Sequence, residues 1–345
     1  MQRCLELAQF GGGYVAPNPM VGAVLVLDDQ IIGEGYHQRY GEPHAEPNAI
    51  SSVKNAELIA KSTLYVNLEP CSHYGKTPPC AILIVKHGIK KVVIGTLDPN
   101  PKVAGKGVEI LRAAGIDVVV GVLEAECRSL NKRFFIFQEQ KRPYILLKWA
   151  QTQNGFIDIN RESVSEPPLV ISNPITRQLT HQMRSENQAI LVGTNTVLLD
   201  NPSLTVRNWS GKSPIRIAID REAKIPAHYH LLDGSIPTLI FTEQVKDKQA
   251  SIEYIQIKFD ENCLQTILQE IYERHIHSVL VEGGAKLLNY FIQNDCWDEA
   301  NIEVSPMLIE SGISAPILGC LPITTKIFNE HNWLFYQNKN YNFCK

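Results

Sequence analysis

Residues 68–80 read "LEPCSHYGKTPPC" and follow directly on an apolar, β-branched run. The stretch places Cys71 and Cys80 close together among prolines, a histidine and a lysine. A chain of 345 residues with eight cysteines has too few for a disulfide scaffold, so this pair is a candidate for metal binding. The other cysteines are isolated, and because a free cysteine packs as a small hydrophobe we expect structural roles for them. They are Cys4, Cys127, Cys263, Cys296, Cys320 and Cys344.

A histidine and a glutamate stand upstream in "GEPHAEPNAI", residues 41–50. One histidine and two cysteines leave a fourth position open, as a catalytic zinc requires. His-x-Glu followed by Pro-Cys is the pattern of zinc deaminases, whose glutamate moves protons without binding the metal. The pattern therefore predicts that His44, Cys71 and Cys80 bind Zn²⁺ and that Glu46 is the general acid and base. A solvated surface pair, or a structural zinc with His73 as fourth ligand, remains an alternative.

Both ends of this pattern are typical of helix starts. Pro43 and Pro47 suit a first helical turn, where a missing amide hydrogen costs nothing, so His44 and Glu46 are predicted at a helix N-terminus. "TPPCAILIVKHG" likewise predicts Cys80 near a helix start, where the helix dipole favours a thiolate.

The surrounding sequence alternates strands and helices, which favours a layered α/β fold. We expect two strands in 21–37 around a turn at Asp28 and Asp29, and further strands in 62–70 and 90–99. Helices are expected over 45–57, 79–87 and 107–114.

A charged, aromatic helix ends at Pro143, and a second α/β region begins there, so we place the domains at 1–142 and 143–345. Strands of the second domain are expected at 144–150, 189–193, 214–220, 237–242 and 277–284. Helices are expected over 174–184 and 264–274.

Composition excludes several classes of protein. A 38.7 kDa chain with 44% hydrophobic and 20% charged residues is an ordinary globular protein of two domains. A net charge of -3 gives no general attraction to nucleic acids, and no apolar run approaches the roughly 20 residues of a membrane span. The N-terminus lacks a signal-peptide core. We expect a cytoplasmic enzyme that acts on a small molecule and has neither nucleic acid nor membrane as a partner.

Four runs in the first half resemble one known family: "APNPMVGAVLV", "GEGYHQRYGEPHAE", "EPCSHYGKTPPC" and "DPNPKVAGKG". The family is that of the bifunctional riboflavin biosynthesis enzymes, in which a diaminohydroxyphosphoribosylaminopyrimidine deaminase is joined to a 5-amino-6-(5-phosphoribosylamino)uracil reductase. Nucleic-acid deaminases carry Pro-Cys-x-x-Cys instead, so the longer spacer here separates the two groups. The resemblance implies a cytidine-deaminase-like, three-layer first domain with zinc at the three ligands above.

The resemblance also implies a set of contacts with a phosphoribosyl pyrimidine substrate. Turn and cap roles are the ordinary alternative for the asparagines and the aspartate in this set. Pro47 departs from the family, which usually has an aliphatic residue there. The implied substrate residues are Asn18, His37, His73, Lys76, Asp98 and Asn100.

The second half resembles the reductase half of the family, whose fold is similar to dihydrofolate reductase. The matching runs are "RPYILLKWA", "HQMRSENQAILVGTNTVLLDNPSLTVR", "PIRIAID" and "VEGGAKLLNYF". The resemblance implies NADPH as cofactor, and arginines suit the substrate phosphate because their planar fork binds oxygens bidentately. Implied substrate residues are Lys148, Arg184, Leu204, Arg207 and Glu282, and implied cofactor residues are Ala150, Thr196, Asp200, Gly283, Gly284, Ala285, Lys286 and Leu287.

From the residues alone, the glycine pair lies between a predicted strand and a predicted helix. Backbone amides at such a helix N-terminus can approach a phosphate, although a simple tight turn also explains the pair. No G-x-G-x-x-G is present, so an ordinary Rossmann site is not indicated.

This half departs from the family at two places. "TQNG", Thr152–Gly155, replaces the usual Ser-Leu-Asp-Gly, and Val170 replaces a tryptophan. A deaminase with an inactive reductase half is therefore one alternative, and a nucleic-acid-editing deaminase is another. A homodimer through the reductase half is implied by the family.

Overall fold

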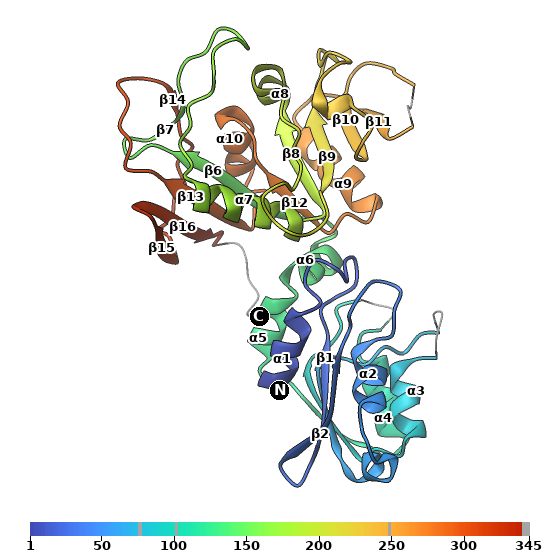
Figure 1. Cartoon of the computed structure of the whole chain (residues 1–345). Coiled ribbons are helices and arrows are strands. Elements are labelled where there is room, and N and C mark those ends of the chain that lie inside the picture. The colour runs from blue at the N-terminus through green and yellow to red at the C-terminus, as the bar shows by residue number, and fades with distance from the viewer. Residues whose placement is uncertain (75–77, 101–102, 248–249, 340–345) are drawn as a thin grey trace. The chain divides into compact units, whose positions relative to one another are not determined.

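The computed structural model describes residues 1–74, 78–100, 103–247 and 250–339 (Figure 1). It divides the chain into two compact units, one ending at Lys141 and the other starting at Arg142. Among the described residues, no helix has both the length and the apolar character needed to cross a membrane.

The first unit is built on a five-stranded sheet in the order β2-β1-β3-β4-β5. β1 pairs antiparallel with both β2 and β3, whereas β3, β4 and β5 run parallel. The expected β1–β2 turn is confirmed, with Asp28 and Asp29 at φ 49° and 60°. The strands are β1 Gly22–Leu27, β2 Gln30–Tyr36, β3 Thr63–Leu68, β4 Lys91–Thr96 and β5 Asp117–Val120.

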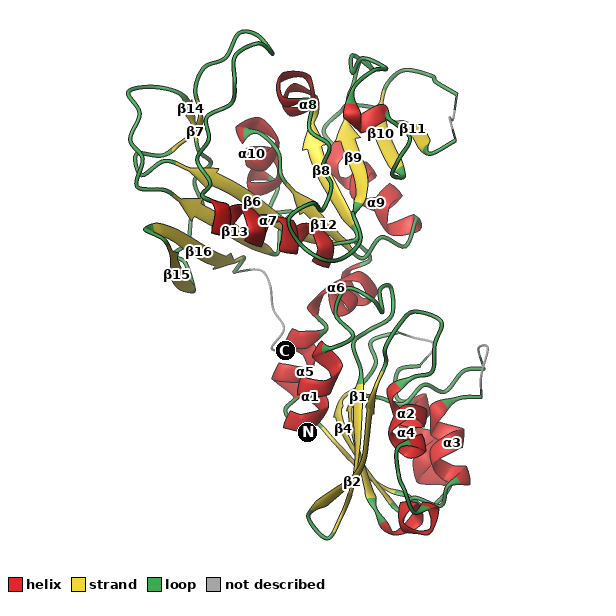
Figure 2. Ribbon diagram, viewed as in Figure 1, coloured by secondary structure: helices red, strands yellow, loops and turns green. Residues whose placement is uncertain are grey.

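Helices cover both faces of this sheet and make the three-layer arrangement visible in Figure 2. α1 and α5 pack together on one face, while α2, α3 and α4 form a layer on the other. The core between sheet and second layer is aliphatic, with Leu64, Val66 and Ile84 fully shielded. The helices are α1 Gln2–Gln9, α2 Ala45–Ser51, the 3-10 helix Ala56–Lys61, α3 Cys80–Lys86, α4 Lys106–Ala113, α5 Glu124–Leu130 and α6 Lys132–Gln140.

One expected helix is shorter than predicted. The helix expected over 45–57 ends at Ser51, and the Ser52 hydroxyl donates to the Ala49 carbonyl at this end. Asn55 then starts a separate 3-10 helix by accepting a hydrogen bond from the Glu57 amide. The expected starts of α2 and α3 are confirmed, since His44 is the N-cap of α2 and Cys80 is the first residue of α3.

The second unit is built on a nine-stranded sheet in the order β11-β10-β9-β8-β12-β6-β13-β16-β15. From β11 to β13 all neighbours are parallel, and β16 and β15 add two antiparallel strands at one edge. β7 Phe156–Asp158 and β14 Ile313–Ser314 pair separately. The main strands are β6 Tyr144–Gln151, β8 Ala189–Gly193, β9 Ile215–Ile219, β10 Thr238–Thr242, β11 Ile252–Gln256, β12 Ser278–Val281, β13 Glu299–Val304, β15 Thr324–Phe328 and β16 His331–Gln337.

α9 and α10 pack on one face of this sheet and supply much of its core, including Ile267 and Phe291. α7 lies on the opposite face (Figure 1). Every strand expected in the second domain is confirmed, and the sequence missed β7, β11, β13, β14, β15 and β16. The helices are α7 Pro174–Glu186, α8 Thr194–Asp200, the 3-10 helix His230–Leu232, α9 Cys263–Glu273 and α10 Ala285–Gln293.

Candidate functional site

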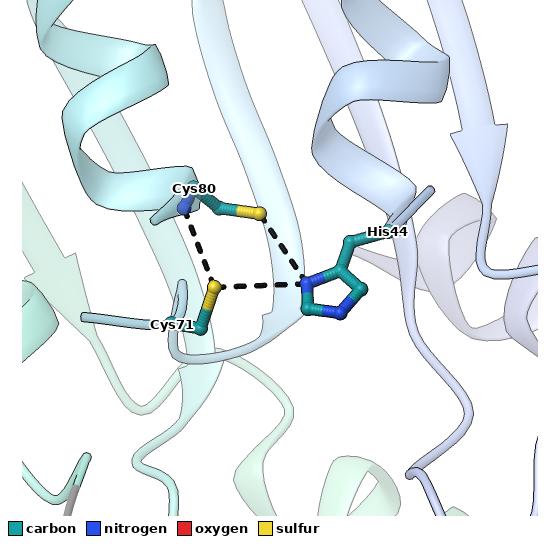
Figure 3. A group of neighbouring side chains, drawn as sticks. All are labelled: His44, Cys71 and Cys80. Atoms are coloured by element: carbon teal, nitrogen blue, oxygen red, sulfur yellow. Dashed lines mark hydrogen bonds between the residues drawn. The ribbon is translucent and has the colours of Figure 1, made fainter. Parts of the chain in front are cut away.

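Three candidate metal ligands come together in the first unit from three segments (Figure 3). His44 caps α2, Cys71 follows β3, and Cys80 begins α3. Nδ1 of His44 lies 3.6 Å from Sγ of Cys71 and 3.4 Å from Sγ of Cys80. All three ligand atoms lie within 4.8 Å of one another. A histidine nitrogen and two sulfurs at this spacing form the donor set of a three-ligand zinc site.

The surroundings of the two thiols favour a thiolate at Cys71. Hydrogen bonds from the Cys80 thiol and from His44 lower the pKa of Cys71 against the opposing effect of burial. The backbone N–H of Cys80 also donates to Sγ of Cys71, at 3.3 Å. Because a metal binds the thiolate form, the cluster is preformed for a cation, and its chemistry fits Zn²⁺.

Glu46 lies in the first turn of α2, two residues beyond His44, and its side chain is buried. Burial, together with the negative charge of Cys71, raises the pKa of Glu46 to about 7. A carboxyl group with a pKa near neutrality can both accept and return a proton. The structure therefore places a candidate proton carrier beside the candidate metal ligands.

Asn18 and His37 meet next to the cluster. Nδ2 of Asn18 lies 3.1 Å from Nε2 of His37, and Nδ1 of His37 lies 3.0 Å from the carbonyl oxygen of Pro43. The rings of His37 and His44 meet edge to face, with centroids 5.3 Å apart. Burial lowers the pKa of His37 and so favours the neutral ring. Two predicted substrate residues are thus held against a candidate metal ligand.

The other predicted substrate residues of this unit differ in their placement. The Asp98 carboxylate accepts a hydrogen bond from the Asn100 amide at 2.7 Å, and burial raises the pKa of Asp98 to about 6. This is the Asx turn that the ordinary interpretation of such residues predicts. His73 is exposed, and Lys76 lies outside the described residues.

Two buried asparagines that sequence reasoning missed fix the loop carrying Asn18. Asn131 accepts from the Met20 amide at 2.8 Å and donates to the Met20 carbonyl at 2.9 Å. Asn67, at the end of β3, donates to the same carbonyl and accepts from Gly22. Asn67 could have been found in the sequence, because it is a polar residue inside the apolar run "TLYVNLEP".

In the second unit, predicted substrate residues pair with one another. Arg184 on α7 and Glu282 after β12 form a bidentate ion pair, with N···O distances of 2.8 and 2.6 Å. Both side chains are largely buried. Lys148 on β6 is also buried, and this burial lowers its pKa against the opposing charges of Glu282 and Glu303. The structure thus gathers three of the predicted residues into one charged group.

The loop after α8 carries the other two predicted substrate residues of this unit, Leu204 and Arg207. Arg184 donates to the Thr205 carbonyl at 3.2 Å, and Arg207 donates to the Thr205 hydroxyl at 3.1 Å. The Arg207 amide donates to Nδ1 of His181, and Leu204 is buried at a left-handed φ of 53°. The Arg207 side chain is exposed, so its charge stays accessible to a ligand.

Two predicted cofactor residues, Thr196 and Leu287, contact the diglycine turn, which begins α10. The Gly284 amide donates to Oγ1 of Thr196 on α8 at 3.1 Å. A Cβ at Gly283 would lie 2.6 Å from Cδ2 of Leu287, so a larger residue there would displace the Leu287 side chain. Lys286 is exposed, whereas Ala150 and Ala285 are half-buried.

Two polar groups of the second unit were not anticipated from the sequence. Arg161 pairs with both Asp158 and Asp200, so the predicted cofactor residue Asp200 is already held by a cation. Glu303 is fully buried and accepts from Ser172 at 2.6 Å, and it lies 2.7 Å from Nδ1 of His331. Except for Asp158, which is three residues from Arg161, the partners are far apart in sequence, and no motif links them.

Two family models match the chain. Residues 1–96 match the cytidine and deoxycytidylate deaminase zinc-binding region, and residues 143–317 match the RibD C-terminal domain. The first match includes His44, Glu46, Cys71 and Cys80, and the second includes the Arg184–Glu282 pair.

Curated relatives and solved structures match almost the whole chain. It is 41% identical over 324 residues to the riboflavin biosynthesis protein RibD of Aquifex aeolicus, covering 92% of this chain and 89% of the relative. The Escherichia coli RibD is 35% identical, with 90% and 88% covered. A Thermotoga maritima structure described as a diaminohydroxyphosphoribosylaminopyrimidine deaminase/5-amino-6-(5-phosphoribosylamino)uracil reductase superimposes with a TM-score of 0.88 at 37% identity, covering 98% and 97% of the chains. Acinetobacter baumannii RibD gives 0.85 at 32% identity, covering 97% and 96%.

Proposed function

Because this chain belongs to the RibD family of bifunctional riboflavin biosynthesis proteins, a deaminase joined to a reductase, we propose its substrates, cofactors and site residues. The deaminase acts on 2,5-diamino-6-(5-phosphoribosylamino)pyrimidin-4(3H)-one and removes an amine by hydrolysis. The reductase then uses NADPH to convert the ribosyl side chain into a ribityl chain. We assign deamination to residues 1–142 and reduction to residues 143–345. The comparisons give no support to an inactive reductase half or to a nucleic-acid editor.

The observation that carries the deaminase proposal is the cluster of His44, Cys71 and Cys80 beside the buried Glu46. These three ligands would hold Zn²⁺ and leave its fourth position open, whereas a structural zinc usually has four protein ligands. When bound, zinc supplies a Lewis acid that makes a water molecule acidic near neutral pH.

Glu46 moves the proton in this reaction. As a water molecule attacks the amine-bearing ring carbon, the Glu46 carboxylate accepts a proton from that water. It then delivers the proton to the departing amine, which leaves as ammonia. Asn18 and His37 hold the pyrimidine ring, and the His37–Pro43 hydrogen bond keeps the ring of His37 in place. Asp98, Asn100, His73 and Lys76 complete the substrate contacts, and Lys76 offers the positive charge for the phosphate.

The reductase site is formed around the Arg184–Glu282 pair. NADPH supplies the hydride, which passes to C1 of the opened ribose. Arg207, exposed beside Thr205, contributes a fork of donors for the substrate phosphate. The bidentate pair with Glu282 holds Arg184 in one orientation. The arginine side chain is therefore already in position when the substrate binds. Lys148 and Leu204 complete the substrate contacts.

The cofactor lies at the start of α10. The turn at Gly283 and Gly284 leads into the N-terminus of α10, and the backbone amides of a helix N-terminus suit a phosphate. Thr196, Asp200, Ala150 and the first residues of α10, Ala285, Lys286 and Leu287, line the same site. The replacements at Thr152–Gly155 and Val170 fall in this half of the chain and bear on cofactor preference.

We further propose a homodimer in the cytoplasm, formed through the second unit. Its outermost strand, β15, is solvent-exposed, and an edge strand invites pairing with another chain. Large apolar side chains gather in the same part of the sequence, as expected of an interface. The exposed residues are Leu308, Ile317, Leu321, Ile323 and Ile327. The mass in solution, measured by sedimentation, tests this assembly.

One assay tests both activities. The zinc-loaded protein is given the diaminopyrimidinone nucleotide and NADPH, and ammonia release and the absorbance of NADPH are followed together. We expect ammonia first and then loss of NADPH in equal amount. Ammonia without oxidation of NADPH would remove the reductase proposal, and loss of neither would remove both.

A further inference from the structure

Glu69 is a buried carboxylate next to the metal cluster that the proposed mechanism does not use. It lies between the end of β3 and Cys71, and its residue is only 4% exposed. Its own amide donates to the Thr96 carbonyl of the parallel neighbour β4 at 3.0 Å. The side chain is therefore fixed where two strand ends meet at one edge of the sheet.

The Glu69 carboxylate accepts four hydrogen bonds, all from backbone amides. Oε2 accepts from Asp98 at 3.2 Å and from Gly105 at 3.0 Å. Oε1 accepts from Gly107 at 2.9 Å and from Val108 at 3.2 Å. Oε2 thus joins Asp98, just after β4, to Gly105, the N-cap of α4, and Oε1 holds the first turn of α4.

Close packing at Gly107 shows how tightly these segments join. A Cβ at Gly107 would lie 2.2 Å from the carbonyl oxygen of Pro70 and 3.1 Å from Oε1 of Glu69. Glycine lets the start of α4 touch the chain immediately before Cys71. The carboxylate and this contact together link the segment that carries a candidate metal ligand to the segment that carries Asp98.

We propose that Glu69 is a positioning residue of the deaminase, which sets the place of Asp98 relative to the metal ligands and thereby the affinity for the pyrimidine substrate. The inference rests on the proposed function, which puts Asp98 in the substrate site. Glu69 acts through Asp98 and touches no substrate, because its two oxygens are already occupied by amides. A glutamine here turns one acceptor into an NH₂ donor that faces backbone N–H groups, so one pair of hydrogen bonds is lost.

The test is deaminase kinetics of Glu69→Gln in the full, zinc-loaded chain, with ammonia as the readout. The KM should rise about tenfold or more with a smaller change in kcat, which is the signature of lost binding. Zinc content and reductase KM should stay at the wild-type values. Glu109→Gln is the matched control, since Glu109 is exposed on α4 and should leave KM unchanged.

A double-mutant cycle with Asp98→Asn separates positioning from a general structural role. Asparagine keeps the acceptor for the Asn100 amide, so it removes only the charge of Asp98. If Glu69 acts through Asp98, Glu69→Gln raises KM much less in the Asp98→Asn background than in the wild type. If Glu69→Gln raises KM by the same factor in the Asp98→Asn background as in the wild type, the proposal is overturned. An unchanged KM, or a loss of zinc that accounts for the defect, would also overturn it.

Glu69→Asp keeps both oxygens and withdraws them by one methylene, so its KM should lie between those of wild type and Glu69→Gln. If the glutamine variant does not fold, the aspartate variant enters the same cycle with the same criteria. Wild-type protein that releases no ammonia would refute the proposed function. Active wild type with an unaffected Glu69 variant would refute only the positioning role.

Discussion

The two units arrange their charged side chains in opposite ways. In the first unit, two sulfurs and a histidine nitrogen lie within 4.8 Å of one another. In the second, the least exposed charges pair with one another, as in Arg184 with Glu282 and Arg161 with Asp158 and Asp200. A metal site is therefore recognisable from the protein alone, because its histidine nitrogen and two sulfurs come together as a set of zinc donors. A site for an organic anion is harder to recognise, because its cations, such as Arg184, are paired with carboxylates of the protein.

Replacing one metal ligand should have the largest effect. Cys71→Ser removes a thiolate ligand, so we expect loss of zinc and at least about a thousandfold loss of deamination. Reduction of the already deaminated nucleotide should be unchanged. Metal analysis and the two separate assays measure this outcome. Cys320→Ser, at a half-buried cysteine of the second unit, is the control and should retain zinc.

Removing the proton carrier should be nearly as severe but leave the metal in place. Glu46→Gln should lower kcat of deamination by about 10²–10⁴-fold, the usual contribution of a general acid and base. Zinc content should be unchanged, because Glu46 is not among the ligand atoms. Glu42→Gln, at an exposed position in the loop just before α2, should behave as wild type. Near-normal deamination by the Glu46 variant would contradict its role.

Breaking the ion pair of the second unit should cost stability as well as activity. Arg184→Ala leaves the buried Glu282 without its partner, and we expect a loss of about 3–5 kcal/mol in the free energy of unfolding. Denaturant unfolding followed in the second unit measures this. Arg221→Ala breaks an exposed pair with Glu243 in the same unit and should cost no more than about 1 kcal/mol. Equal costs would mean that the internal pairing of the reductase site is not structural.

The smallest expected effect is a pH dependence in the second unit. Burial, with a smaller contribution from His275, lowers the pKa of His277 to about 4 from an ordinary value of 6.5. The unfolded state then binds more protons between these two pH values, so stability falls as pH drops below about 6.5. Between pH 7 and pH 5 the expected loss is about 1–2 kcal/mol. His277→Gln should flatten this slope in denaturation curves, and an unchanged slope would assign it to other groups.

Local patterns were enough to predict much of the fold. Apolar, β-branched runs predicted β3, β4 and β8, and neighbouring prolines predicted the starts of α2 and α3. The edge strand β15 was missed because its exposed, mixed side chains carry no clear alternation. The length of α2 was overestimated because Asn55, inside the range expected to be one helix, is the N-cap of a separate 3-10 helix.

The sequence by itself determined the family, the α/β class and the identity of the candidate metal ligands. Residue types in "LEPCSHYGKTPPC" and "GEPHAEPNAI" carry that information directly, because metal binding needs particular atoms rather than particular surroundings. Only the tertiary structure decided which groups are neutralised and which are held in place. Glu69 and the Arg184–Glu282 pair depend on partners 29–39 and 98 residues away in sequence. Such partners meet only when strand order is fixed, since hydrogen bonds and ion pairs act over a few ångströms in space and not along the chain.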